Sequence, residues 1–197
     1  QMKNGFTYHG TEIDTMGGSY GRLQSSAQWG KQIDDVAVYG AIERAHDDGF
    51  RNFSSSDIRR FYGDIGYRNG GNEFHLNMGI ADNLLGQPAS VPIELINRFW
   101  GATYTTPQTT QNRVGYLNLT GKVEVTPSWT LGGTAHVRAF NQAVVDGNST
   151  SAQPCADPTL LCFGDNTTPA NGLNGSQLSN PFPPNAILGE IDRDWTR

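Results

Sequence analysis

The sequence has no long run of apolar residues. A helix needs about 20 consecutive apolar residues to cross a bilayer, so helical spans are excluded. The strands of a membrane barrel are not excluded, because each gives only a weak signal. The chain also lacks a basic excess, since its formal net charge is -5. That balance argues against nucleic acid as a partner, because binding it requires a basic face.

The chain starts at Gln1, without an initiating methionine or a signal peptide, so we expect a processed product or a fragment. Cysteine is scarce: Cys155 and Cys162 lie in a segment rich in Pro, Asp, Asn and Gly. Their spacing does not match the close-spaced pairs of zinc sites, and no histidine lies nearby. A local disulfide in an oxidising compartment fits better than two free thiols, which remain the alternative.

Four segments alternate apolar and polar residues over about ten positions each. In the clearest, Phe74, Leu76, Met78 and Ile80 are separated by polar residues or glycine. A period of two indicates extended strands with one apolar and one polar face. Strands of about ten residues are long for a soluble sheet but suit a tilted crossing of a bilayer. The four segments are 59–68, 73–80, 114–125 and 129–140.

The connections between strands alternate in length. Loops as long as 83–112 and 142–188 are unusual in a compact soluble domain but normal on the outside of a membrane barrel. Only the first hairpin, at 17–20, breaks the alternation. We expect eight strands at about 5–16, 20–29, 35–45, 58–68, 73–82, 113–125, 129–141 and 189–197, with short links at 30–34, 69–72 and 126–128 and long loops at about 46–57, 83–112 and 142–188.

Trp29, Tyr67, Phe74 and Trp129 all lie beside short turns, as one interfacial girdle requires, although soluble strands also place aromatics near their ends. In the membrane interpretation one set of side chains faces lipid and another lines a wet interior. The lipid-facing set is Leu23, Phe61, Phe74, Leu76, Leu119 and Val137; the interior set is Arg22, Gln24, Gln28, Arg60, Asp64, His75, Asn77, Lys122, Glu124, His136 and Arg138.

The expected fold is therefore all-β: an antiparallel, up-and-down transmembrane β-barrel, of which this chain supplies about eight strands. Two alternatives remain. A complete eight-stranded outer-membrane barrel with a structural or adhesive role requires strand 189–197 to pair with strand 5–16. A soluble β-sandwich binding module has strands that alternate in the same way. It requires a second sheet to bury Phe61, Phe74, Leu76 and Leu119.

Three segments, 17–22 (GGSYGR), 47–51 (DDGFR) and 59–68 (RRFYGDIGYR), follow one another along the first part of the chain. The first resembles the first barrel hairpin of TonB-dependent outer-membrane receptors of the siderophore-receptor type, and the other two resemble later loop and strand material of that family. Residues 1–5 (QMKNG) look like the exit from the plug domain into the barrel. The resemblance covers most of 1–141 and the last strand, whereas 142–188 carries no signature.

The resemblance implies a barrel of about 22 strands in the bacterial outer membrane, with a plugged lumen and import powered through TonB. It implies no enzymatic activity and no cofactor. Ferric siderophores are the commonest ligand class of the family, and cobalamin, haem and some sugars are others. This chain shows neither a plug nor a TonB-contacting segment. We therefore expect 1–5 to end the plug-to-barrel linker and 6–197 to form the N-terminal part of the barrel.

Other motifs carry little chemistry. Segment 17–21 matches G-x-S-x-G, but a polar alternating strand follows where a nucleophile elbow needs a helix, so we expect a hairpin. The aspartate pairs at 34–35 and 47–48 suit capping and supply too few oxygens for calcium. The histidines at positions 9, 46, 75 and 136 are scattered, and none has a nearby carboxylate at the spacing of metal ligands. No metal site is therefore predicted.

One loop segment suggests a binding role. Apolar residues at 91, 95, 96, 99 and 100 have helical spacing, which predicts a short helix within the 83–112 loop. Aromatic and arginine side chains near the outer mouth suit an anionic, aromatic ligand such as a ferric siderophore. The candidate ligand-binding residues are Arg98, Phe99, Trp100 and Tyr104. Alternatively, Phe99 and Trp100 simply pack the loop onto the barrel rim.

Overall fold

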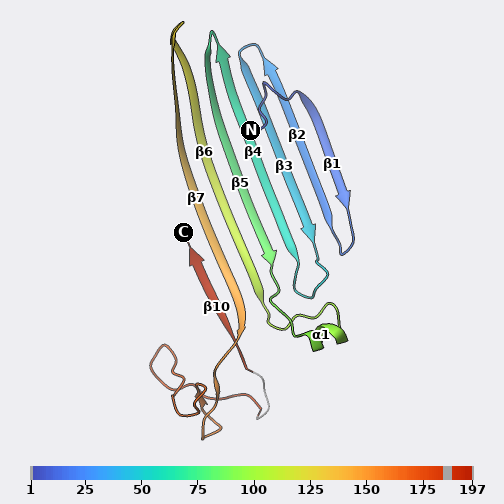
Figure 1. Cartoon of the computed structure of the whole chain (residues 1–197), viewed down its shortest axis with the longest axis vertical. Coiled ribbons are helices and arrows are strands. Elements are labelled where there is room, and N and C mark those ends of the chain that lie inside the picture. The colour runs from blue at the N-terminus through green and yellow to red at the C-terminus, as the bar shows by residue number, and fades with distance from the viewer. Residues whose placement is uncertain (1, 184–187, 197) are drawn as a thin grey trace.

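The computed structural model describes residues 2–183 and 188–196 of the chain. Eight strands form one antiparallel sheet in the order β1-β2-β3-β4-β5-β6-β7-β10 (Figure 1). These strands are β1 (Gly10–Gly17), β2 (Leu23–Ile33), β3 (Val36–Asp47), β4 (Ser56–Asn69), β5 (Asn72–Gly86), β6 (Gln108–Thr126), β7 (Trp129–Ser149) and β10 (Gly189–Thr196). One short helix, α1 (Ile93–Arg98), and a small second sheet of β8 (Gln153–Pro154) and β9 (Leu161–Cys162) lie in the long connections.

The eight expected strands and their up-and-down order are confirmed, but most strands are longer than predicted. β6 has 19 residues and β7 has 21, so the ladder continues well beyond the alternating apolar positions. Backbone pairing between antiparallel neighbours does not depend on side-chain polarity, which is why the apolar pattern underestimates strand length. The loop expected at 83–112 consequently shrinks to 87–107. The last residue of the predicted strand 189–197 lies outside the described residues.

The tight turns follow from residues that tolerate positive φ. Gly70 and Gly71 have φ of 54° and 83° and form a two-residue hairpin, as a primed turn requires. The link expected at 30–34 is shorter, since β2 runs to Ile33 and only two aspartates remain between the strands. Segment 17–21 ends β1 and enters a hairpin connection, which excludes the nucleophile elbow. Arg22, expected on the inner face of a strand, lies in that connection instead.

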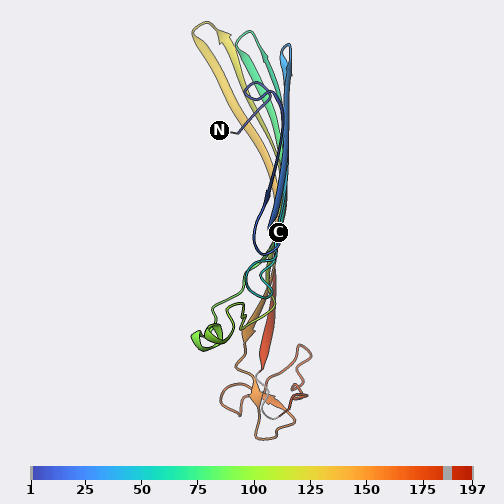
Figure 2. The ribbon, with the colours of Figure 1, turned by 90° about the vertical axis from the view of Figure 1, so that its right-hand side faces the viewer.

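The N-terminal segment departs from the prediction. The strand expected from residue 5 begins only at Gly10, because a turn forms around Asn4. The Asn4 side-chain oxygen accepts bonds from the amides of Phe6 and Thr7, both at 3.0 Å. Residues 2–9 then lie against one face of the curved sheet (Figure 2). We call this face the inner face and the opposite one the outer face. The most buried residues of the sheet include Tyr39 and Asp64, which lie under or beside the N-terminal segment.

The outer face carries an uninterrupted apolar area across five strands. Directly paired residues of an antiparallel sheet project from the same face. From β3 to β7 four successive rows of partners contain no charged side chain, and the hydroxyl of Tyr67 is the sole polar group. On β2 the same face carries Lys31 near the hairpin end. We call these four rows the apolar band: Val36, Tyr67, Phe74, Gly121, Gly133; Val38, Ile65, Leu76, Leu119, Ala135; Gly40, Gly63, Met78, Leu117, Val137; Ile42, Phe61, Ile80, Gly115, Ala139.

The band is exposed, which decides against the sandwich alternative. Phe61, Phe74, Leu76 and Leu119 keep 38%, 37%, 39% and 49% of their surface accessible. No second sheet covers them anywhere in the described residues. The pairing expected of a closed eight-stranded barrel is also not found, because β1 and β10 form opposite edges of the sheet. The remaining members of the interior set, from Gln24 to Arg138, are on the inner face by register.

The four turn-side aromatics lie on the outer face, and three of them lie near the short hairpins. Register places Tyr67 and Phe74 in the row next to the β4–β5 hairpin, and the alternation of β7 places Trp129 on the same side at the end of its strand. Trp29 is also on the outer face, but it pairs with Gly40 two rows further into the sheet, because β2 continues to Ile33. All four are exposed. Within the described ranges, no helix has the length and apolar character needed to span a membrane.

Candidate functional site

The predicted helix in the long loop is present, although it is only one and a half turns long. α1 begins after Pro92 and ends at Arg98, whose charge suits the carboxyl end of a helix. It lies on the inner side of the sheet, the side of the N-terminal segment (Figure 2). Trp100 follows with 68% of its surface exposed, and Phe99 and Tyr104 are exposed too.

The structure brings Trp100 against aromatics from two other connections. Its ring centroid is 6.1 Å from that of Phe50, and Phe50 is 6.3 Å from Tyr20. We call Tyr20, Phe50 and Trp100 the aromatic cluster. Two hydrogen bonds join the loop of Phe50 to the loop of Trp100. The Asn52 amide donates to the Gly101 carbonyl at 2.9 Å, and the Thr103 hydroxyl donates to the Asn52 carbonyl at 2.6 Å.

Of the four predicted site residues, Trp100 alone joins this cluster. Tyr104 lines a separate hollow against the start of β10. Phe99 is exposed and lies close to Gly101 within its own loop, which is not the packing onto the rim that the alternative proposed. Sequence reasoning missed Tyr20 and Phe50, which belong to other connections. The two segments that carry them, 17–22 and 47–51, had already been singled out by the resemblance, which was the available signal.

Next to the aromatic cluster the inner face is hollowed. The hollow has a volume of about 510 Å³ and is walled by loop residues and by inward-facing side chains of β3, β4 and β5. We call it the loop-end hollow. Its lining includes two arginines and one aromatic of the cluster, Arg22, Arg51 and Phe50, beside the apolar side chains of Ala45, Ile58, Leu85 and Pro88.

Arg51 gives the hollow its charge. Its Nη1 donates to the Ala89 carbonyl at 3.2 Å, and its guanidinium lies 5.5 Å from the Phe50 ring. The Nε atom of Arg51 is buried and has no hydrogen-bond partner in the protein. The same holds for Oδ1 of Asn83, a residue that pairs across the strands with Ile58, which lines the hollow. These two are the sole such side-chain atoms in the described part of the chain. Buried polar groups normally have partners, so these two atoms are exceptions among the described residues.

The neighbouring charges are already paired. Arg22 contacts the Asp47 carboxylate at 3.4 Å, and His46 contacts Asp48 at 3.0 Å and Asp57 at 3.3 Å. Arg51 has no acidic partner within the described residues. The hollow therefore presents one uncompensated guanidinium next to aromatic rings, an arrangement suited to an anionic, aromatic ligand.

A second polar group lies deeper on the inner face. Nδ1 of His75 contacts the two oxygens of Asp64 at 3.1 and 3.0 Å, and its Nε2 contacts Glu73 at 3.0 Å. The Phe6 ring packs edge-on against the imidazole, with centroids 5.8 Å apart. These contacts with two carboxylates were not apparent from the sequence. Glu73 and His75 share a face of β5, and the hairpin register brings Asp64 beside them.

This network is structural. Both nitrogens of His75 are bonded in different directions, so the three side chains do not converge on a point where an ion could sit. No group of three or more His, Cys, Asp and Glu residues is placed to hold a metal ion in the described ranges. Arg68 donates to Glu73 at 2.7 Å and completes the set. The network holds β4, β5 and the N-terminal segment together.

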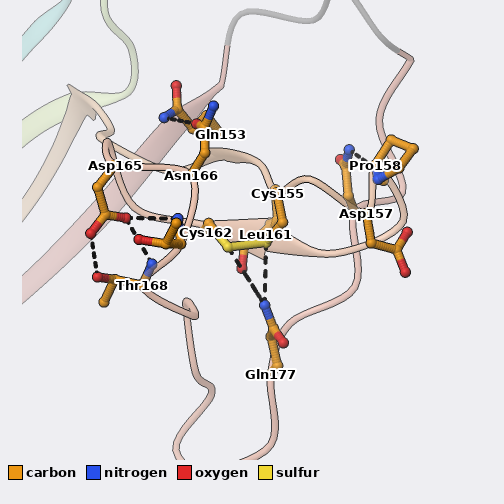
Figure 3. Close-up of a disulfide and its surroundings, with 12 residues drawn as sticks. Gln153, Cys155, Asp157, Pro158, Leu161, Cys162, Asp165, Asn166, Thr168 and Gln177 are labelled. Atoms are coloured by element: carbon orange, nitrogen blue, oxygen red, sulfur yellow. Dashed lines mark hydrogen bonds between the residues drawn. A yellow bond between two sulfur atoms is a disulfide. The ribbon is translucent and has the colours of Figure 1, made fainter.

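The long connection after β7 contains a disulfide between Cys155 and Cys162 (Figure 3). The Gln177 amide donates to the Leu161 carbonyl at 3.1 Å and ties a later part of the connection to it. Asp165 accepts bonds from the amides of Thr167 and Thr168 at 2.9 and 2.7 Å. Segment 142–188 carries no sequence signature. This part of it is a loop held by the disulfide and by its own backbone hydrogen bonds.

Comparison with known proteins gives no match to this chain, whether with family models, curated proteins or solved structures.

Proposed function

We propose that this chain is part of the barrel of a TonB-dependent outer-membrane receptor. The receptor would actively import a scarce ligand, and the ligand that we propose is a ferric siderophore. The observation that carries the proposal is the apolar band, an exposed apolar area spanning five long antiparallel strands. A soluble protein rarely leaves so large an area uncovered, whereas a membrane barrel presents such an area to lipid.

The strand edges support a barrel larger than eight strands. The free edges of β1 and β10 expose unpaired backbone groups, which a bilayer does not tolerate. Further strands pairing with both edges remove that cost and close the sheet. The short hairpins at one end and the long connections at the other match the periplasmic and external sides of such a barrel (Figure 1).

The ligand class follows from the loop-end hollow. It opens beside the aromatic cluster on the side of the long loops, where a ligand from outside the cell arrives. Arg51 supplies a guanidinium with no acidic partner among the described residues, and Phe50 and Trp100 supply aromatic faces. Iron complexes of catechol-type siderophores carry negative charge and aromatic rings, so they satisfy both features through ion pairing and cation–π contacts.

Uptake of iron tests this proposal. Cells that lack their own siderophore receptors would produce the full-length protein containing this chain and receive radioactive iron bound to catecholate or hydroxamate siderophores. We expect uptake of a catecholate complex that disappears when TonB is deleted. Uptake no greater than in receptor-free cells across the siderophore panel, or uptake that persists without TonB, would contradict the proposal.

A further inference from the structure

Two arginines face each other on the outer surface. Arg44 of β3 and Arg59 of β4 are direct cross-strand partners, and both side chains are exposed. Cβ atoms of such partners lie about 5 Å apart, and like charges in that arrangement destabilise a sheet. An anion bound between the two guanidinium groups would offset this repulsion.

The protein itself does not supply that anion. Asp82 lies opposite Arg59 on β5, but both of its oxygens are engaged elsewhere. Oδ1 accepts from Gln111 at 3.0 Å, and Oδ2 accepts from Nε of Arg113 at 3.1 Å. In the next row toward the loops, His46 and Asp57 contact each other at 3.3 Å. Neither Arg44 nor Arg59 has a side-chain hydrogen bond or ion pair within the described residues.

The position of the pair suggests which anion it meets. Arg44 and Arg59 lie two residues along their strands from Ile42 and Phe61, the last row of the apolar band on the side of the long loops. A hollow of about 440 Å³ adjoins Arg44 on the same face. In a membrane barrel, this is the level at which acyl chains give way to headgroups. Guanidinium groups bind phosphate in a bidentate manner, and long basic side chains reach such headgroups from the edge of an apolar surface.

We propose that Arg44 and Arg59 form a binding site for the phosphorylated headgroup of a membrane lipid. The inference rests on the proposed function, because it requires the apolar band to face lipid. The acyl chains would cover the band next to Ile42 and Phe61, and a headgroup phosphate would lie between the two guanidinium groups. The lipid would then offset the repulsion between the arginines and anchor the barrel at a fixed depth.

Lipid binding to the full-length protein tests the site. The protein would be purified in a neutral detergent and titrated, with native mass spectrometry as the readout, with a diphosphorylated lipid and with the same lipid after enzymatic removal of its phosphates. Inorganic phosphate at matched concentration would be a third arm. We expect binding of the phosphorylated lipid to fall by at least about tenfold in the double variant R44Q/R59Q, because both guanidinium groups that would bond the phosphate are lost.

Arg138→Gln is the matched control. It makes the same arginine-to-glutamine change at one exposed arginine of the inner face, whereas the double variant makes it at two. The Arg138 guanidinium lies 5.4 Å from the Phe140 ring. This variant should bind the lipid like the wild type. Equal binding of the phosphorylated and dephosphorylated lipids, an R44Q/R59Q variant that binds normally, or competition by inorganic phosphate alone would overturn the proposal. A failure here with TonB-dependent uptake intact would leave the proposed function standing.

Discussion

The imidazole of His75 contacts both oxygens of Asp64, and the Asp64 side chain is fully buried. A buried carboxylate is costly unless it is paired and hydrogen-bonded. His75 provides the pairing, and the amide of Asn77 provides a further bond. The pair therefore fixes the β4–β5 hairpin at the point where the N-terminal segment packs.

We expect His75→Ala to destabilise the protein by about 1–3 kcal/mol, because it leaves the Asp64 carboxylate buried with fewer partners. His136→Ala is the control, since His136 is exposed on the same face and forms no side-chain bond within the described residues. Urea unfolding of the full-length protein in lipid vesicles, followed by tryptophan fluorescence, measures both. Equal stability of the two variants would show that the network does not hold the sheet.

The N-terminal segment should depend on the small size of Gly5. A Cβ atom added there would lie 2.5 Å from the Val38 amide nitrogen, so Gly5→Ala must push the segment away from β3. Gly40→Ala, on the same strand as Val38, meets nothing within 4 Å and serves as control. Hydrogen exchange of residues 3–8 should accelerate severalfold in Gly5→Ala and stay unchanged in Gly40→Ala. Unchanged exchange in both would mean that the segment is not seated on the inner face.

The aromatic cluster predicts a specific loss of affinity. Trp100→Ala removes the ring that lies against Phe50, and we expect the dissociation constant of the siderophore to rise about tenfold, the scale of one aromatic or cation–π contact. Phe163→Ala removes another exposed aromatic, from the disulfide loop, and should leave the affinity unchanged. Binding of the iron-loaded siderophore to the full-length protein measures both. A larger loss in Phe163→Ala would place the ligand on the disulfide loop.

The disulfide loop should show a defined pH dependence. The Thr168 hydroxyl, with the amides of Thr168 and Thr167, holds the pKa of Asp165 well below its usual 3.8. A lowered pKa means that the carboxylate stabilises the loop above its usual pKa and stops doing so as the pH falls through the lowered value. Protection of 163–169 from hydrogen exchange, corrected for intrinsic rates, should therefore persist at pH 4 and decline only in stronger acid.

Asp165→Asn should lower that protection at neutral pH, and the difference from the wild type should vanish in strong acid. Asn174→Ala is the control, because Asn174 accepts a similar turn bond from the Ser176 amide and does not titrate. Its effect on protection should be independent of pH. A constant effect of Asp165→Asn at every pH would show that the charge of Asp165 does not stabilise the loop.

Much of the sheet could be predicted from the sequence. The alternation around Phe74 and Leu76 and the glycines at 70–71 determine strand direction, face and turn, because each depends on residues adjacent in the chain. The strand ends could not be predicted in the same way. Strands β6 and β7 continue past the apolar positions, since pairing with a neighbour, rather than side-chain polarity, sustains them.

The candidate site was only partly predictable for the same reason. The helix near Trp100 follows from local spacing, but its contact with Phe50 joins two loops far apart in sequence. The bonds of His75 likewise depend on hairpin register, which the scattered positions of the histidines do not reveal. Residues 5–7, expected in a strand, form a turn instead, because the Asn4 side chain accepts hydrogen bonds from the amides of Phe6 and Thr7.

The claim that the outer face meets lipid is tested most directly by a spin-label scan along β6. Because Cys155 and Cys162 are bonded to each other, a single introduced cysteine is the sole free thiol of the described chain. Nitroxides at 117, 118, 119 and 120 of the full-length protein in vesicles would be compared for access to oxygen and to a water-soluble nickel reagent.

We expect positions 117 and 119, which belong to the apolar band, to be accessible to oxygen and shielded from nickel, and positions 118 and 120 to show no such lipid signature. Nickel access at 117 and 119, or shielding of these positions from both reagents, would contradict the membrane placement on which the account depends.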